Sequence, residues 1–147
     1  MNKKIDELNA KKNKLALGGG ESAIEKQKSI GKLTARERID AILDKNSFDE
    51  CDMFVRHNVH EFGMEKKELP CDGVITGTGT INGRPICIYA QDFTVQGGSL
   101  GLMHARKITK VMDYSLKMRI PCIGISDSGG ARIQEGVDAL AGYGGIF

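Results

Sequence analysis

The sequence lacks the features that would direct it to a membrane or out of the cell. No apolar run approaches the ~20 residues that a bilayer-spanning helix needs. After Met1-Asn2-Lys3-Lys4 the chain stays polar, without the apolar segment of a signal peptide. We therefore expect a cytoplasmic protein without direct membrane contact.

Charge of one sign and paired cysteines are also scarce. The net charge is only +2, and basic residues are mixed with acidic ones and not gathered in one block, so nothing points to nucleic acid. The four cysteines form no CxxC pair, and with no secretory context we expect reduced thiols. What remains is a 147-residue chain, 40% hydrophobic and 27% charged, as in a soluble globular domain.

The first part of the chain is predicted to be helical. Lys3–Leu17 and Glu21–Ser29 are charged segments with thin apolar stripes, separated by glycines. A third helix begins at Thr34, where Thr34 and Glu37 have the spacing of a capping box. Helices with such thin stripes are expected to lie on another surface and not to form a core themselves.

The pattern then changes to strands. Met53 and Val55 alternate as in a short strand, and 56–70 shows little pattern, as in an irregular loop. Segments 73–81 and 84–92 read as two strands joined by the hairpin turn Asn82-Gly83.

Helices and strands alternate toward the carboxyl end. We expect a long helix over 99–117, a buried strand over 122–125 and a helix from Ala131 that is broken at 142–145. This order predicts an α/β layered fold with a sheet covered on both faces. Such a sheet needs more strands than the chain supplies, so we expect a fragment of a longer protein.

Two glycine turns each follow a strand and precede a helix: Gly97-Gly98-Ser99 and Gly129-Gly130-Ala131. Glycine lets a ligand approach the backbone, and a helix N-terminus leaves N–H groups unpaired. Two such turns side by side would offer donors to one oxygen, as an oxyanion hole does. Tight turns without a ligand explain the same pattern, and the residues alone leave both readings open.

Four segments of the chain resemble biotin-dependent acyl-CoA carboxyltransferases, the family of propionyl-CoA carboxylase β chains. They are 31–39 (GKLTARERI), 72–77 (DGVITG), 91–100 (QDFTVQGGSL) and 127–137 (DSGGARIQEGV). The resemblance implies a crotonase-like fold of stacked ββα units. It divides the chain into an N-terminal helical segment, 1–45, and the first part of the N-terminal carboxyltransferase domain, 46–147.

The resemblance also implies an activity. The family transfers a carboxyl group between carboxybiotin and propionyl-CoA or methylmalonyl-CoA through an enolate. Gly129, Gly130 and Ala131 would form the oxyanion hole, and Gly97, Gly98, Ser99 and Arg132 would contact the acyl-CoA. Biotin would arrive on a separate biotin carboxyl carrier protein, charged by a biotin carboxylase, and the subunits would form a hexamer.

Other interpretations fit the sequence less well. Ser128 as a hydrolase nucleophile lacks the last glycine of GxSxG and any later histidine. His57 and His60, with Cys51 and Cys71, fit no zinc spacing, so no metal site is expected. The segment Gly77-Thr78-Gly79 lacks the third glycine of a dinucleotide loop.

Several alternatives stay open from the sequence. Three roles are open for the charged helices. They could face solvent, pack on a neighbouring subunit, or contact the CoA phosphates through Lys32, Arg36 or Arg38. A sodium-pumping methylmalonyl-CoA decarboxylase would use the same subunit to remove the carboxyl group. A third reading is an inactive CoA-binding or assembly module, since 147 residues alone are expected to show no turnover. The identity of the acyl-CoA is not predicted.

Overall fold

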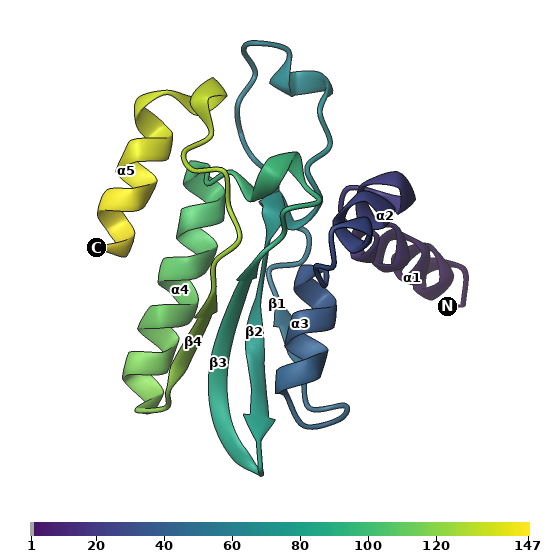
Figure 1. Cartoon of the computed structure of the whole chain (residues 1–147), viewed down its shortest axis with the longest axis vertical. Coiled ribbons are helices and arrows are strands. Elements are labelled where there is room, and N and C mark those ends of the chain that lie inside the picture. Colours follow the sequence, from purple (N-terminus) through teal and green to yellow (C-terminus); the bar gives the residue numbers. More distant parts are fainter. Residues whose placement is uncertain (1) are drawn as a thin grey trace.

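The computed structural model describes residues 2–147 as one four-stranded sheet with helices on both faces (Figure 1). The strands lie in the order β1-β2-β3-β4. The helices and strands are α1 Asn2–Ala16, α2 Glu21–Ser29, α3 Ala35–Ile42, β1 Asp49–Cys51, β2 Val74–Ile81, β3 Arg84–Gln91, α4 Leu102–Met118, β4 Cys122–Ile125 and α5 Val137–Ile146. Short 3₁₀ turns occupy Met64–Lys66, Pro70–Gly73, Gln96–Gly98 and Ile133–Glu135.

The β2–β3 hairpin forms as the sequence predicts. Ile81 pairs with Arg84, which leaves Asn82 and Gly83 as a two-residue turn with φ of 51° and 74°. Two positive φ values are what a type I′ hairpin turn requires. The Asp44 carboxylate fixes the turn by accepting hydrogen bonds from the N–H groups of both turn residues, at 2.9 and 2.8 Å.

Each face of the sheet packs on a different helix. On one face, Ile39 of α3 and Leu43, directly after this helix, form a core with Ile75, Ile86 and Ile88. The Thr34–Glu37 capping box, predicted from the sequence, starts this helix. On the other face α4 packs through a second core, made up of Val74, Leu100, Ala105 and Ile108. The consecutive residues Val74 and Ile75 of β2 therefore point to opposite cores.

Strand β4 differs from the prediction of a buried strand. It pairs with β3 in parallel, from Cys87–Cys122 to Ala90–Ile125, and ends the sheet. Cys122 and Gly124 are exposed, because no fifth strand covers that edge within residues 2–147. Because β3 and β4 are parallel and joined through α4, their carboxyl ends lie at the same end of the sheet.

Three further predictions about elements were wrong. The short strand is Asp49–Cys51 and not Met53–Val55, because Asp52 has a positive φ of 58° that ends it. A 3₁₀ turn and Gly136, at φ 54°, delay the last helix from Ala131 to Val137. The glycines at 142–145 do not break α5, which continues to Ile146. A Cβ on Gly142 would lie 2.8 Å from Ala105 Cβ on α4. That glycine lets α5 approach α4 closely.

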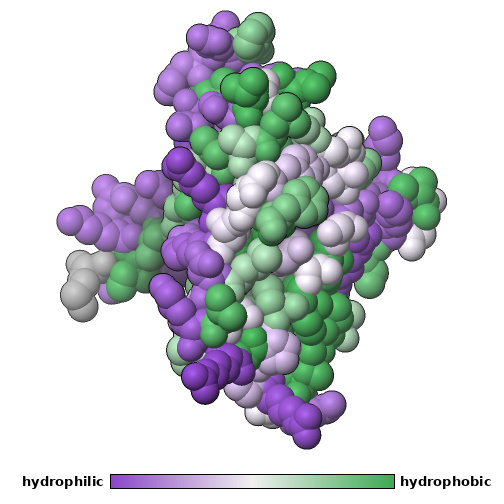
Figure 2. All heavy atoms as spheres, turned by 90° about the vertical axis from the view of Figure 1, so that its left-hand side faces the viewer, coloured by the Kyte–Doolittle hydropathy of each residue, from purple (hydrophilic) through white to green (hydrophobic). Residues whose placement is uncertain are grey.

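The outer side of α5 is apolar and exposed. Figure 2 looks onto this side of the molecule, where hydrophobic atoms gather. Four residues there are between 62% and 99% exposed: Ile133, Val137, Leu140 and Phe147. Val137 and Leu140 lie on α5 itself, Ile133 in the 3₁₀ turn before it and Phe147 directly after it. Large apolar side chains exposed together are typical of an interface. Within residues 2–147, no helix is both long and apolar enough to cross a bilayer.

Candidate functional site

The two glycine turns lie side by side at the carboxyl ends of β3 and β4. The Gly129 N–H donates to the Gly97 carbonyl at 2.9 Å, and the Leu100 N–H donates to the Gly130 carbonyl at 2.9 Å. Leu100 and Ala131 form an isolated parallel bridge. The sequence placed the turns at the ends of two strands, and the parallel pairing of β3 and β4 brings them together.

Glycine is needed in the first turn for two different reasons. Gly97 and Gly98 both have positive φ, 65° and 61°. A Cβ on Gly98 would lie 2.2 Å from the Asp127 carbonyl oxygen, whereas one on Gly97 would meet nothing within 4 Å. The close contact between the turns therefore depends on Gly98.

Hydrogen bonds inside the turns already use most of the N–H groups that the sequence proposed as donors. Besides the Gly129 N–H, the Gly130 N–H is engaged, donating to Ser128 Oγ at 3.1 Å. In the first turn, the N–H groups of Gly98 and Ser99 donate to the Val95 and Gln96 carbonyls at 2.9 and 3.3 Å.

The Ala131 N–H is different. Within the described chain it has no hydrogen-bond partner, and the residue is half-buried. Its direction is fixed, because the same planar peptide unit carries the Gly130 carbonyl, which accepts from the Leu100 N–H. In a trans peptide the two groups point in opposite directions, so the Ala131 N–H points away from Leu100. Of the three N–H groups in this turn, only that of Ala131 is therefore available as an oxyanion-hole donor in residues 2–147.

Arg132, expected at the acyl-CoA, is fully buried and supports the turn. Its side chain has five N–H groups, and five contacts account for all of them. They run to Asp72 Oδ1 (2.6 Å), Glu135 Oε1 (2.8 Å), the Asp72 carbonyl (3.2 Å), the Ser99 carbonyl (2.9 Å) and Ser99 Oγ (3.5 Å). The guanidinium has no donor left for a ligand in this arrangement.

The carboxylates beside Arg132 are buried with it. Burial raises the pKa of Asp72, against the lowering effect of the Arg132 charge. Asp72 Oδ1 faces the guanidinium, while Oδ2 has no hydrogen-bond partner in residues 2–147. Sequence reasoning missed the role of Asp72, because its partner Arg132 lies 60 positions away along the chain.

Glu135 connects the turn to α4. Its Oε2 accepts from the Leu102 N–H at 2.7 Å, at the first residue of that helix. The N-cap residue, Gly101, has no side chain to do this. A carboxylate at a helix N-terminus also interacts favourably with the helix dipole.

Asp127, at the start of the second turn, holds the N-terminal helices. Its carboxylate accepts from Arg38 Nη2 at 2.7 Å, Gln27 Nε2 at 3.2 Å and Lys32 Nζ at 3.2 Å. Arg36 forms two hydrogen bonds with Glu50, at 2.7 and 3.0 Å. Of the three basic residues considered for the CoA phosphates, all have carboxylate partners here, and Lys32 is the most exposed, at 46% of its side chain.

His104 lies in the buried core next to this network. It is completely buried, and its Nδ1 donates to the Asp72 carbonyl at 2.9 Å, since a carbonyl can only accept. Nε2 then accepts from Gln91 Nε2 at 3.2 Å. Burial, with help from the Arg132 charge, lowers the His104 pKa to about 3, so the imidazole is neutral.

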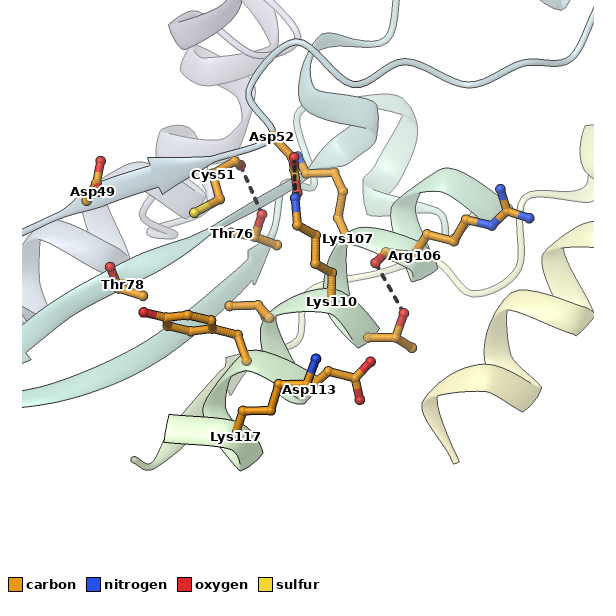
Figure 3. Close-up of a pocket in the computed structure, with 13 residues that line it drawn as sticks. Asp49, Cys51, Asp52, Thr76, Thr78, Arg106, Lys107, Lys110, Asp113 and Lys117 are labelled. Carbon is orange, nitrogen blue, oxygen red and sulfur yellow. Dashed lines mark hydrogen bonds and ion pairs between the residues drawn. The ribbon is translucent and has the colours of Figure 1, made fainter. Parts of the chain in front are cut away.

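A separate groove of about 600 Å³ lies between α4 and the β1–β2 part of the sheet (Figure 3). Lys110 Nζ crosses it to the Asp52 carboxylate at 2.8 Å, and the Cys51 carbonyl accepts from Thr76 Oγ1 at 3.1 Å. Partial burial raises the pKa of the Cys51 thiol. The residues that line the groove include none from the two glycine turns.

The side chains considered for a hydrolase or metal site are engaged in other contacts. Ser128 Oγ contacts the Gly130 backbone, while His57 contacts the Lys67 carbonyl and His104 is bonded in the core. In the part of the chain that the structure describes, no three His, Cys, Asp or Glu side chains converge as metal ligands would.

Comparison with known proteins places these features in a family. The family described as the carboxyl transferase domain matches residues 26–147. The chain is 60% identical to methylmalonyl-CoA decarboxylase subunit alpha of Veillonella parvula and 52% identical to the propionyl-CoA carboxylase beta chain of Roseobacter denitrificans. The alignments cover 98% and 97% of this chain, but the chain spans only about 28% of each relative's length.

Solved structures also match this chain. Transcarboxylase 12S, a hexamer crystallised with methylmalonyl-CoA, superimposes with a TM-score of 0.98 at 47% identity, over 99% of this chain and 29% of its own. A malonate decarboxylase from Pseudomonas matches less closely, with a TM-score of 0.69 at 29% identity over 78% of this chain. The predicted fold, part of a crotonase-like α/β unit, is confirmed by these structures.

Proposed function

The chain belongs to the carboxyl transferase domain family, and on that premise we propose that it forms the acyl-CoA-binding part of a biotin-dependent carboxyltransferase. The substrates would be propionyl-CoA and methylmalonyl-CoA, which the names of the relatives and the ligand of transcarboxylase 12S support.

The chemistry needs a stabilised enolate. Removing a proton next to the thioester carbonyl places negative charge on the carbonyl oxygen, and a fixed N–H donor lowers the energy of that state. Biotin, on a carrier protein, would supply or accept the carboxyl group. This chain's task is to hold the thioester with its oxygen against the donor and its α-carbon open to the biotin side.

One observation carries the proposal: the Ala131 N–H is unpartnered in residues 2–147, while the neighbouring N–H groups of Gly129 and Gly130 are engaged. We assign the Ala131 N–H to the thioester oxygen and assign Gly129 and Gly130 to shaping the turn. Gly97, Gly98 and Ser99 form the adjoining wall.

The proposal is tested by removing the donor. In the protein made from the complete reading frame, Ala131→Pro deletes the N–H, whereas Ala131→Ser keeps it. We expect carboxyl transfer to fall by roughly 10²-fold or more in the proline variant and by much less in the serine variant. Isothermal titration with propionyl-CoA checks binding. Absence of binding by the unmodified protein, or equal activity of the two variants, would contradict the proposal.

Decarboxylation is the second candidate. The identity of 60% to the Veillonella decarboxylase subunit, against 52% to the Roseobacter carboxylase chain, favours it. Assaying the protein with biotin carrier in both directions, with and without membranes from its own cells, separates the two. Membrane- and sodium-dependent loss of CO₂ from methylmalonyl-CoA supports the decarboxylase, and ATP-dependent carboxylation of propionyl-CoA supports the carboxylase.

The partners follow from the same proposal. A biotin carboxyl carrier protein would present biotin, and a biotin carboxylase would charge it if the reaction runs toward carboxylation. The whole protein would assemble as a cytoplasmic hexamer, supported by the hexamer of transcarboxylase 12S. Light scattering after gel filtration measures the assembly, and a monomer would contradict it.

A further inference from the structure

Arg132 lies at one end of a continuous series of hydrogen-bonded peptide groups. Its Nη2 donates to the Ser99 carbonyl at 2.9 Å. The same peptide unit carries the Leu100 N–H, which donates to the Gly130 carbonyl at 2.9 Å. That second peptide unit carries the Ala131 N–H, which has no partner within residues 2–147.

Each group in this series donates to the next, from Arg132 toward Ala131. A positive charge beside the Ser99 carbonyl draws electron density toward its oxygen, which makes the Leu100 N–H a stronger donor. The Leu100 N–H in turn does the same to the Gly130 carbonyl and the Ala131 N–H. Successive hydrogen bonds strengthen one another by about 10–30% per bond, and the effect is largest where water is excluded.

Arg132 is suited to this task because water cannot screen it. The side chain is fully buried, and the carboxylates of Asp72 and Glu135 fix the guanidinium on the side away from Ser99. Every other guanidinium N–H also has an acceptor, so the group cannot turn away without breaking a buried contact.

We propose that Arg132 is a positioning residue for the reaction, which orients and polarises the Ala131 N–H through the Ser99–Leu100 and Gly130–Ala131 peptide units. This rests on the proposed function, because it takes the thioester oxygen as the acceptor at Ala131. It assigns Arg132 no contact with the acyl-CoA. Asp72 and Glu135 hold the guanidinium in place.

The test uses the thioester carbonyl as a reporter. Propionyl-CoA labelled with ¹³C at this carbon is bound to the protein from the complete reading frame, and the carbonyl stretch is read by infrared difference spectroscopy. A polarising donor lowers this frequency relative to free propionyl-CoA. We expect Arg132→Met to move the frequency back toward the free value and to lower kcat roughly 10-fold, with KM changed less than about 3-fold.

Lys107→Met is the matched control. Lys107 is also a buried cation, but its Nζ donates to the carbonyls of Cys71 and Val74, which lie outside the series. Its loss is expected to lower the melting temperature and to leave the carbonyl frequency unchanged, without a selective fall of kcat relative to KM. A shift equal to that of the arginine variant would show a general effect of core damage and overturn the proposal.

Arg132→Lys replaces the methionine variant if that variant does not assemble. The ammonium can pair with Asp72 and Glu135 but lacks the planar fork that also reaches the Ser99 carbonyl. An unchanged carbonyl frequency in whichever variant folds overturns the proposal. If the unmodified protein does not bind propionyl-CoA or does not lower the frequency, the proposed function fails and this inference fails with it, so the two failures are told apart.

Discussion

At the scale of single residues, Gly97 and Gly98 are both glycine for conformational reasons, but only Gly98 is also required by a close steric contact. Both need a positive φ, but only Gly98 lies against the Asp127 carbonyl. Neighbouring glycines with the same conformation thus have different tasks: one allows the turn, and the other allows the two turns to meet.

This difference is measurable with two alanine variants. Gly97→Ala adds only the left-handed cost of about 1–2 kcal/mol. Gly98→Ala adds the same cost and a Cβ placed 2.2 Å from a backbone oxygen, so its total loss is expected to exceed about 3 kcal/mol. Thermal unfolding of the protein from the complete reading frame compares them. Equal melting temperatures would show that the turns are not in contact.

His104 predicts how stability depends on pH. Its pKa falls from 6.5 to about 3 on burial, so between these values the unfolded chain binds a proton that the folded chain does not. The contribution of the neutral imidazole to the free energy of unfolding is therefore complete above pH 6.5 and is lost as the pH falls toward 3. The slope is at most about 1.4 kcal/mol per pH unit.

His104→Asn supplies the comparison. Its amide can donate to the Asp72 carbonyl, as Nδ1 does, but it does not titrate. Melting temperatures measured from pH 7 to pH 4 should fall less steeply for the variant than for the unmodified protein. Parallel curves would mean that the imidazole is not buried neutral.

At the scale of elements, Asp127 joins the N-terminal helices to the second glycine turn. The hydrogen bonds from Arg38 and Lys32 hold the pKa of Asp127 below its ordinary value, although burial works against them. The carboxylate therefore stays charged, and its contribution is lost only in acid below its ordinary pKa of 3.8.

Asp127→Asn should loosen α2 and α3. We expect a loss of about 1 kcal/mol, and faster amide hydrogen exchange in these two helices than in the unmodified protein. The control is Glu68→Gln, since Glu68 also pairs with two cations, Lys14 and Arg56, but all three are well exposed. That variant is expected to change stability by less than about 0.5 kcal/mol. An equal effect of both would contradict a specific role for Asp127.

Local patterns predicted the elements that local contacts determine. The bounds of α2, the capping box at Thr34 and the hairpin turn at Asn82 were all confirmed. The errors arose where distant contacts decide, as in α5, whose Gly142 allows close packing on Ala105 and does not break the helix. Likewise, nothing local shows that Glu135 begins α4 by accepting from its first N–H.

At the scale of the whole molecule, family segments in the sequence identified the fold and the two turns, but not which N–H groups remain free. That depends on pairings such as Gly129 with Gly97 and Leu100 with Gly130, which join residues about 30 positions apart. The sequence predicted ligand contact for Arg132 and did not predict its buried ion pair with Asp72, which lies 60 positions away.

The exposed face of α5 gives a prediction for the 147 residues alone. Val137 and Leu140 are 77% and 62% exposed, so the isolated chain should self-associate through this face. Leu140→Glu should reduce the association seen by light scattering, whereas Ile30→Glu, at a residue 64% exposed outside this face, should not. Equal effects would show that association is unspecific. The isolated chain is also expected to show no carboxyl transfer.

The most direct measurement is a structure of the protein from the complete reading frame with propionyl-CoA bound. The account predicts the thioester oxygen within about 3 Å of the Ala131 nitrogen, with the Leu100–Gly130 hydrogen bond intact behind it. A thioester bound elsewhere, such as in the groove beside Lys110, or an Ala131 N–H paired with another chain segment, would contradict it.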